Sequence, residues 1–573
     1  MLNIKDHKTI NMFDPFDYLG PKRRKMLDES WAGIFRDHIR QILPVDFLAL
    51  HFSANMGRPT NELVAMMGAM VLQQMNDLND VETAEQFSFN IQWHYALDIT
   101  DNSDKNAYVC PRSILNMRSV MTKYGIYDRV FNAIGDELIK IFDADTSLQR
   151  IDSVHIFSNM KHLGRIGIFT STIKKFLVNL KRHHKDEFNE LDLNLRERYL
   201  KKEEESFFAM VKPSESAKTL QMVADDLCFL INKFGSHPDI PSMKTYQLMT
   251  RVLKEQCITE QDEKTHEKRI SLKANKDIPS DSLQNPSDPD AGYSGHKGKG
   301  YQVQIAETYS IEEGKGLNKL SLITHVDVQS AHESDADALM PYIETTEQRG
   351  IKPKEALADT IYGGDDNHEA AQQKGVNLIA PTLDKQKDLF CTLTDFEFSE
   401  NGFVISCPEN CQPIKTSKKK DRFTIAFSSE RCGACPRADH CPVKPGKKDL
   451  AYLRYNEKNV RLSRRRQYER TDDFKNKYRF RAGVEATMSQ LDRRTGIKHL
   501  RVRGMKAVRF AATMKATALN IIRAAAYKKR QNKGKSPSSP SFGGLIGLIL
   551  VIKVRFLKNF GKIAKVETAM ARF

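Results

Sequence analysis

Residues 147–157, with the sequence SLQRIDSVHIF, decide the fold class of this chain. Polar and apolar residues alternate along the stretch, and Ile and Val favour extended backbone, so it predicts a strand with one face against a core. Asp152 lies in the middle of that strand. A carboxylate is costly to bury inside an apolar strand, which makes Asp152 a candidate functional residue.

Further strands are predicted on the C-terminal side of this one. They lie at residues 301–308, 321–329, 356–358 and 376–380. Helical patterns at residues 334–348 and 367–374 separate the last two strands from the others. Three strands followed by helix, strand, helix and strand indicate an α/β protein with a mixed sheet and flanking helices.

The rest of the chain divides by composition into further parts. Residues 60–75 follow Arg58-Pro59 and have helical spacing of apolar residues, and residues 281–300 are rich in turn residues. We expect an all-α N-terminal domain (1–140), an α/β domain in three pieces (141–160, 290–384 and 451–530), a helical insertion with a loop (161–289), a cysteine-rich segment (385–450) and a basic tail (531–573).

Charge is distributed unevenly along the 573 residues, whose formal net charge is +16. Residues 451–530 hold 23 Lys and Arg against 6 Asp and Glu, and residues 531–573 hold 8 against 1, so the first 450 residues sum to −8. A basic C-terminal fifth predicts a surface that binds a polyanion. The overall 40% hydrophobic and 28% charged composition excludes a collagen, a coiled coil and a wholly disordered chain.

Three acids stand where metal-dependent chemistry would need them. Asp152 lies in the first strand, Asp359 follows the short strand near 356–358, and Glu485 lies in a helical stretch. Carboxylates from strands and a helix can converge at one sheet edge, and such oxygen donors suit Mg²⁺ or Mn²⁺. Two ions about 4 Å apart can hold the attacking and leaving oxygens of an in-line phosphoryl transfer.

Two residues before Glu485 share its helical face. Arg481 lies four residues earlier and can orient the carboxylate or contact a phosphate. Tyr478 lies seven residues earlier and either contacts a DNA backbone or packs the helix; both interpretations remain open.

These motifs, taken together, resemble the bacterial insertion-sequence transposases of the DDE class. The resemblance covers most of the chain and is carried by the 57–59 and 79–85 segments, Asp152-Ser153, residues 288–291, residues 296–301, Ala358-Asp359 with Tyr362-Gly363, Tyr478, Arg481 and Glu485 with their spacing, and residues 489–496 and 500–504. The first two segments are similar to the InsH-like N-terminal domain of these proteins. One departure is position 492, where the family usually has Lys and this chain has Asp492, with Arg493 beside it.

The resemblance implies a ribonuclease-H-like catalytic domain in which Asp152, Asp359 and Glu485 bind two Mg²⁺ or Mn²⁺ ions. It also implies an enzyme that binds the terminal inverted repeats of its own element, cleaves double-stranded DNA and joins a 3′-hydroxyl to target DNA, as a homodimer on DNA. Two alternatives remain: a nuclease of the same fold that does not join strands, and an inactive transposase-derived DNA-binding protein.

Five of the nine cysteines gather within residues 407–441. Their spacing predicts a structural Zn²⁺ site in a zinc knuckle, with Cys407, Cys432, Cys435 and Cys441 as ligands, while Cys411 or His440 could replace one of them. We expect the metal to hold a β-rich segment too short to build its own core. The other four cysteines, Cys391 among them, are expected to be ordinary buried residues.

Arginines after residue 460 are the expected DNA contacts. Lys and Arg that neutralise phosphates give affinity that falls with salt, and the residues expected to do so with Tyr478 and Arg481 are Arg493, Arg494, Arg501 and Arg503. Neither a signal peptide nor a run of about 20 apolar residues is visible, so a cytoplasmic, nucleoid-associated protein without a membrane partner is expected.

Overall fold

The computed structural model describes residues 2–7, 14–200, 212–261, 268–311, 319–383 and 391–534. Most of the basic tail expected at 531–573, including its apolar run, lies outside the described residues. In the described part no helix is both long and apolar enough to cross a membrane.

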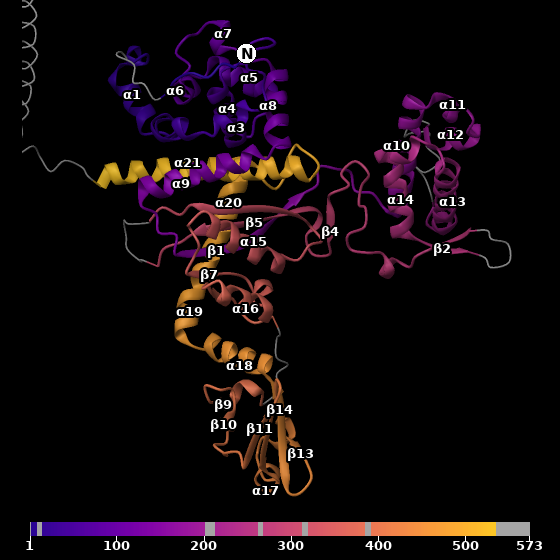
Figure 1. The fold of residues 1–573 in the computed structure, drawn as a ribbon, viewed down its shortest axis with the longest axis vertical. Coiled ribbons are helices and arrows are strands. Elements are labelled where there is room, and N and C mark those ends of the chain that lie inside the picture. Colours follow the sequence, from indigo (N-terminus) through magenta and orange to yellow (C-terminus); the bar gives the residue numbers. More distant parts are fainter. Residues whose placement is uncertain are drawn as a thin grey trace, which may run out of the picture.

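A mixed sheet stands at the centre of the molecule (Figure 1). Its strands are β1 (Leu148–Phe157), β4 (Gly292–Ser294), β5 (Gly298–Thr308), β6 (Ile323–Ser330), β7 (Glu355–Leu357) and β8 (Asn377–Ile379). The order is β6–β5–β1–β7–β8, with the short β4 beside β6 on the same edge of β5. β1, β5 and β6 are antiparallel neighbours, whereas β7 and β8 run parallel to β1. The mixed α/β sheet expected from the sequence is therefore present.

Helices cover both faces of this sheet. On one face lie α15 (Leu339–Gln348) and α16 (Asp365–Gln373), and Tyr342 and Ala371 pack there against Ile151. On the other face lie α20 (Gly483–Thr495) and α21 (Met505–Gly534), which pack against Val303 and Ile305. Alternate residues of β1 thus enter two different cores, whereas the alternation in its sequence predicted one buried face.

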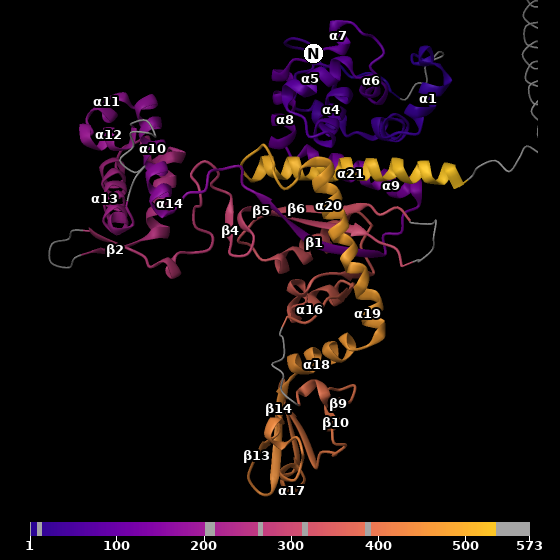
Figure 2. The ribbon, with the colours of Figure 1, turned by 180° about the vertical axis from the view of Figure 1, so that it is seen from behind.

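The N-terminal region is all-helical and packs onto the far side of α21 (Figure 2). Its helices are α1 (Gly20–Asp28), α2 (Trp31–Ile34), α3 (Val45–Ala49), α4 (Leu63–Met75), α5 (Asp80–Phe89), α6 (Ile91–Leu97), α7 (Asp104–Ala107), α8 (Pro111–Lys123) and α9 (Ile126–Phe142). Glu62 caps α4 by accepting from the N–H groups of Val64 and Ala65. Since Phe510, Met514 and Ile521 of α21 are buried in the core of these helices, α21 ties the N-terminal region to the sheet.

A helical insertion follows β1 and has its own hydrophobic core. It consists of α10 (Arg165–His183), α11 (Lys185–Asn189), α12 (Leu193–Leu200), α13 (Ser216–Phe234) and α14 (Lys244–Gln256), with the hairpin β2 (Cys257–Gln261) and β3 (Lys268–Leu272). Figure 1 shows this insertion to one side of the sheet, joined to it near β4.

The cysteine-rich segment forms a β module at the end of the molecule remote from the N-terminal helices (Figure 1). Its elements are β9 (Glu397–Phe398), β10 (Val404–Ser406), β11 (Lys415–Lys419), β12 (Arg422–Ser428), α17 (Ser429–Gly433), β13 (Lys444–Pro445) and β14 (Leu450–Asn456). The expectation that this segment cannot build a core is wrong. β12 and β14 pair in register and bury Phe423, Ile425 and Leu453 against Phe396, because alternate residues of paired strands share one face.

Two helices lead from this module back to the sheet. They are α18 (Glu457–Glu469) and α19 (Asp472–Tyr478), and a short 3₁₀ turn over Arg479–Ala482 joins α19 to α20. The helical character expected for residues 457–530 is thus found, divided among α18, α19, α20 and α21.

Candidate functional site

Strand pairing brings the two aspartates together at one edge of the sheet. β1 and β7 are parallel, with Arg150 opposite Leu357. Asp152 and Asp359 each follow two residues later, just beyond the last paired position. Parallel strands present their carboxyl ends at the same edge, so the two side chains face one another although 207 residues separate them.

A single guanidinium joins these two acids to the third. Arg481 Nη2 lies 2.8 Å from Asp152 Oδ2 and 3.6 Å from Asp359 Oδ2, and Arg481 Nη1 lies 3.1 Å from Glu485 Oε1. The last pair is the i, i+4 contact that the helical spacing predicts. Three acids from a strand, a loop and a helix therefore contact one guanidinium, although their oxygens do not all lie within 4.8 Å of one another.

Backbone donors fix the orientation of both aspartates. The Ser153 N–H donates to Asp152 Oδ1 at 2.8 Å, and the Thr360 N–H donates to Asp359 Oδ1 at 2.7 Å. Burial raises the pKa of Asp152 above the ordinary value, Arg481 opposes this rise, and the negative charges of Asp359 and Asp335 add to it. Carboxylates that repel one another at a solvent-accessible edge form a site that a cation would stabilise.

Tyr478 lies next to the acids but is engaged in packing. Its ring stacks on Phe474 with centroids 5.3 Å apart, and burial together with the charge of Asp359 raises its pKa. Both interpretations of Tyr478 are compatible with this position, since its ring packs while its hydroxyl end stays near Asp359.

The arginines expected to contact DNA lie on two sides of α20 and in the connection between α20 and α21. Arg493 is exposed on α20, and its Nε donates to the Ser489 carbonyl of its own helix at 3.3 Å. Arg494 lies nine residues after Glu485, which at about 100° per residue places it on the opposite side of α20. There it lines a polar cavity with Arg530.

Arg501 and Arg503 lie in the connection between α20 and α21, and both are exposed. Arg501 is 3.4 Å from Asp77 and 3.7 Å from Glu82 of the N-terminal region. Arginines of helix α18 were also expected to contact DNA. Two of them, Arg461 and Arg465, pair with the buried Asp365. These two arginines fasten the cysteine module to α16.

The sequence motif at residues 288–291 has a structural role. Asp288 is fully buried, accepts from the Ser158 and Tyr301 hydroxyls, and accepts from the Gly504 N–H at 3.0 Å. Asp290 accepts from the Met505 N–H at 2.9 Å. Both carboxylates thereby satisfy backbone donors at the start of α21, which an N-terminal helix end would otherwise leave unpaired.

The cysteines of the β module surround one cavity of about 160 Å³. Its walls include all five cysteines of the spacing motif and also Cys391, which the sequence analysis had assigned to ordinary packing. Burial and the neighbouring thiols raise the pKa of Cys432 to about 11, and burial with the Cys441 thiol raises the pKa of Cys391 to about 12. In the described part of the chain, no three of these sulfur atoms lie within 4.8 Å of one another.

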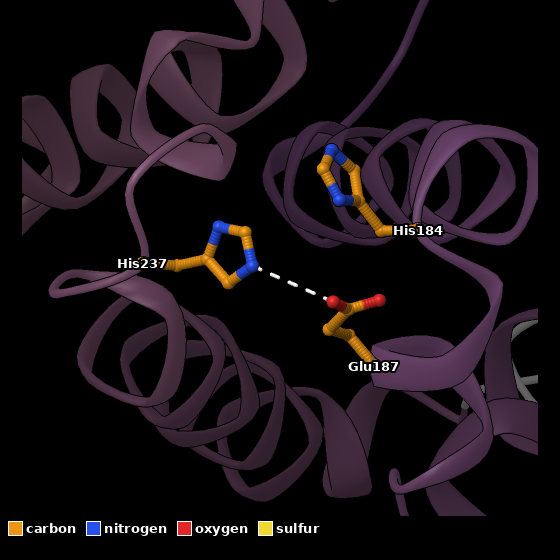
Figure 3. A group of neighbouring side chains, drawn as sticks. All are labelled: His184, Glu187 and His237. Carbon is orange, nitrogen blue, oxygen red and sulfur yellow. Dashed lines mark ion pairs between the residues drawn. The ribbon is translucent and has the colours of Figure 1, made fainter.

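Another polar cluster lies in the helical insertion, where His184, Glu187 and His237 approach one another (Figure 3). The backbone N–H groups of Asp239 and Ile240 donate to His237 Nδ1 at 3.1 and 3.2 Å. The proton of the neutral ring is therefore on Nε2, which faces Glu187 Oε1 at 3.5 Å. With His184, these two side chains form a group whose ligand atoms all lie within 4.8 Å of one another.

Two polar residues that were not predicted as site residues lie beside Asp152. Asp335 accepts from the Ser153 hydroxyl at 3.0 Å, and Lys297 Nζ lies 3.0 Å from the same hydroxyl oxygen. Lys297 belongs to the 296–301 motif, so the sequence contained a signal for it. Asp335 had no such signal, because only the packing of β6 beside β5 brings it to the site.

Comparison with known proteins agrees with this architecture at both ends of the chain. Residues 406–525 match a family described as a transposase DDE domain, a range that includes the cysteine module and Glu485. Residues 24–119, which form much of the helical N-terminal region, match a second family described as a transposase domain.

One curated protein also shows a short similarity. An endo-acting ulvan lyase of Formosa agariphila is 26% identical over 84 residues, which are 14% of this chain and 10% of that protein. The chain thus spans about a tenth of that relative's length, and the likeness carries no argument about activity. The two family matches support a transposase of the DDE class, in agreement with the two aspartates and the glutamate that lie at one sheet edge.

Proposed function

We propose that the chain is a DNA transposase that depends on divalent metal ions. It would bind the terminal inverted repeats of its own insertion sequence, cleave the DNA there and join the freed 3′-hydroxyl to target DNA. The observation that carries the proposal is the contact of one guanidinium with Asp152, Asp359 and Glu485, which come from three separate elements.

The three carboxylates fit a pair of Mg²⁺ or Mn²⁺ ions. They offer only oxygen donors, burial and then the charge of Asp359 raise the pKa of Asp152, and a cationic group already lies among them. Such ions, when bound, supply an activated oxygen nucleophile and stabilise charge on the phosphate. The protein's own contribution is to hold the carboxylates in place through the Ser153 and Thr360 N–H groups and to present Arg481 to a phosphate.

DNA binding would involve residues on both sides of α20. Arg493 stands beside Glu485, Arg494 and Arg530 line the cavity across the helix, and Arg501 and Arg503 lie at the entry to α21. With Tyr478 and Arg481 they would contact phosphates, while the N-terminal helices read the repeat. A synapse of two ends needs two protomers, so we infer a homodimer on nucleoid DNA in the cytoplasm.

Structural Zn²⁺ is proposed for the cysteine module, with Cys407, Cys432, Cys435 and Cys441 as ligands. The shared cavity supports this, since a dication would offset the burial that now raises the pKa of Cys432. Cys411 or His440 could still replace one ligand. Because the module has an apolar core of its own, the metal would stabilise the cavity wall and position the module against DNA.

The test is a plasmid that carries the gene with its flanking DNA, incubated with the purified full chain and Mg²⁺. We expect cleavage at the element ends and covalent joining of 3′ ends to target DNA. Asp152→Asn, Asp359→Asn and Glu485→Gln should each abolish both reactions while the protein still binds DNA. Asp472→Asn is the matched control, because the Asp472 side chain is 91% exposed and its carboxylate lies 3.3 Å from Lys475 Nζ.

The same assay separates the alternatives. Cleavage without joined products would indicate a nuclease of this fold. DNA binding without cleavage by the unaltered chain would indicate an inactive DNA-binding protein. Cleavage that survives all three substitutions would refute the assignment of the carboxylates.

A further inference from the structure

The turn between β4 and β5 brings a lysine to the catalytic carboxylates from a side that the three-acid pattern does not include. Lys297 Nζ lies 3.0 Å from Ser153 Oγ and 3.4 Å from Asp335 Oδ2. Ser153 is the residue whose N–H donates to Asp152 Oδ1. The ammonium group is therefore held one residue away from the first catalytic acid.

Asp335 is built into the fold as the anchor of this lysine. It is 8% exposed, its Oδ1 accepts from Gln304 Nε2 at 2.7 Å, and its Oδ2 accepts from the Ser153 hydroxyl at 3.0 Å. Gln304 is itself held by the Tyr362 hydroxyl, which donates to its side-chain oxygen. Gln304, Ser153 and, through Gln304, Tyr362 thus fix Asp335, which in turn positions the ammonium of Lys297.

The ammonium still has capacity for a further partner. The Lys297 side chain is 36% exposed, and two of its three N–H groups suffice for Ser153 and Asp335. Arg481 supplies the positive charge on the other side of the acids.

We propose that Lys297 contacts the substrate by binding a non-bridging oxygen of a DNA phosphate next to the scissile bond, with Asp335 and Ser153 as its positioning residues. An ammonium is a compact charge that pairs with anions, and the anion delivered to this edge by the proposed transposase function, on which the inference rests, is a phosphodiester. Lys297 differs from the three acids because it binds the phosphate, whereas they bind metal ions.

The experiment removes the charge of single DNA phosphates and, separately, the charge of Lys297. A duplex that the unaltered chain cleaves is prepared with a single methylphosphonate at each phosphate around the cleavage site. Binding is then measured without divalent metal for the unaltered chain, Lys297→Met and Lys297→Arg. Lys299→Met is the matched control, since Lys299 lies two residues away and donates instead to the Leu163 carbonyl at 2.9 Å.

We expect Lys297→Met to bind the unmodified duplex about tenfold more weakly and to lower the salt slope by about 0.9, the value for one lost phosphate contact. One methylphosphonate should weaken binding of the unaltered chain but not of Lys297→Met, and Lys297→Arg should restore that sensitivity. The inference is overturned if the unaltered chain and Lys297→Met show equal methylphosphonate profiles. It is also overturned if Lys297→Met and Lys299→Met lose equal DNA affinity.

Thermal unfolding of each variant establishes that it is folded, and Lys297→Gln replaces Lys297→Met if the latter is not. The two proposals fail differently. If the unaltered chain cleaves the duplex and the profiles coincide, only the role of Lys297 is refuted. If the unaltered chain binds DNA and never cleaves it, the transposase function is refuted as well.

Discussion

The guanidinium of Arg481 occupies the position where cations would be bound, and removing it should strengthen metal binding. In Arg481→Met the three carboxylates keep their positions but lose the cation that contacts all of them. We expect the affinity for Mn²⁺ in the absence of DNA to rise, because the ion no longer competes with an ion pair within the protein.

The size of the effect follows from the burial of each contact. The pair of Arg481 with Asp152 has side chains only 18% and 16% exposed, so it is worth the roughly 1.5–3 kcal/mol of a hydrogen bond to a charged group. The Glu485 side chain is 68% exposed, and solvent screening reduces its share to a small fraction of this. One lost contact of this kind corresponds to at least about a tenfold gain in Mn²⁺ affinity.

Isothermal titration of Mn²⁺ into the full chain at pH 8 measures the change directly. Arg479→Met is the control, since Arg479 is exposed and its guanidinium lies over the Phe480 ring at 5.0 Å. It removes the same charge from the same turn without breaking the pairs with the three acids. Unchanged or weaker Mn²⁺ binding by folded Arg481→Met, or an equal gain in both variants, would refute the competition. DNA cleavage by Arg481→Met should fall in the same preparation, because Arg481 is also the proposed phosphate contact.

Three other perturbations have defined outcomes. Because burial raises the pKa of Asp152, and a metal ion needs the carboxylate ionised, Mn²⁺ affinity should be complete at neutral pH and should decline on acidification at a higher pH than for an ordinary Asp. An Mn²⁺ titration series toward acid pH that gave the same profile for the unaltered chain and for Asp152→Asn would contradict this. Glu307→Gln should lower the free energy of unfolding in urea by about 3 kcal/mol or more, because Glu307 is fully buried between two arginines and its loss leaves their charges unpaired; a change below about 1 kcal/mol would contradict this. Cys432→Ser should remove one equivalent of Zn²⁺ measured by elemental analysis, whereas Cys228→Ser, buried in the helical insertion, should leave the metal content unchanged.

Much of the fold was predictable because local patterns and the required packing agree. The alternation in residues 147–157 predicted β1, and β5 to β8 with the helices between them appear within a few residues of their expected ranges, whereas β4 lies in a segment expected to form turns. The cysteine module is the counterexample. Its short segments each look too small for a core, and only the pairing of β12 with β14 creates an apolar face large enough to bury Phe423 and Ile425.

Local sequence patterns were enough to identify the residue types of the proposed chemistry: two acids after or within strands, a glutamate with an arginine one helical turn before it, and a cysteine cluster with metal-binding spacing. Which of these residues meet depends on the packed chain. The tertiary structure placed Asp152 and Asp359 side by side through the parallel register of β1 and β7, directed Arg461 and Arg465 to Asp365, and brought Asp335 and Lys297 to Ser153. The physical reason is that spacing along a chain specifies neighbours within a helix or strand, whereas contacts across a sheet depend on register and on what each buried charge must pair with.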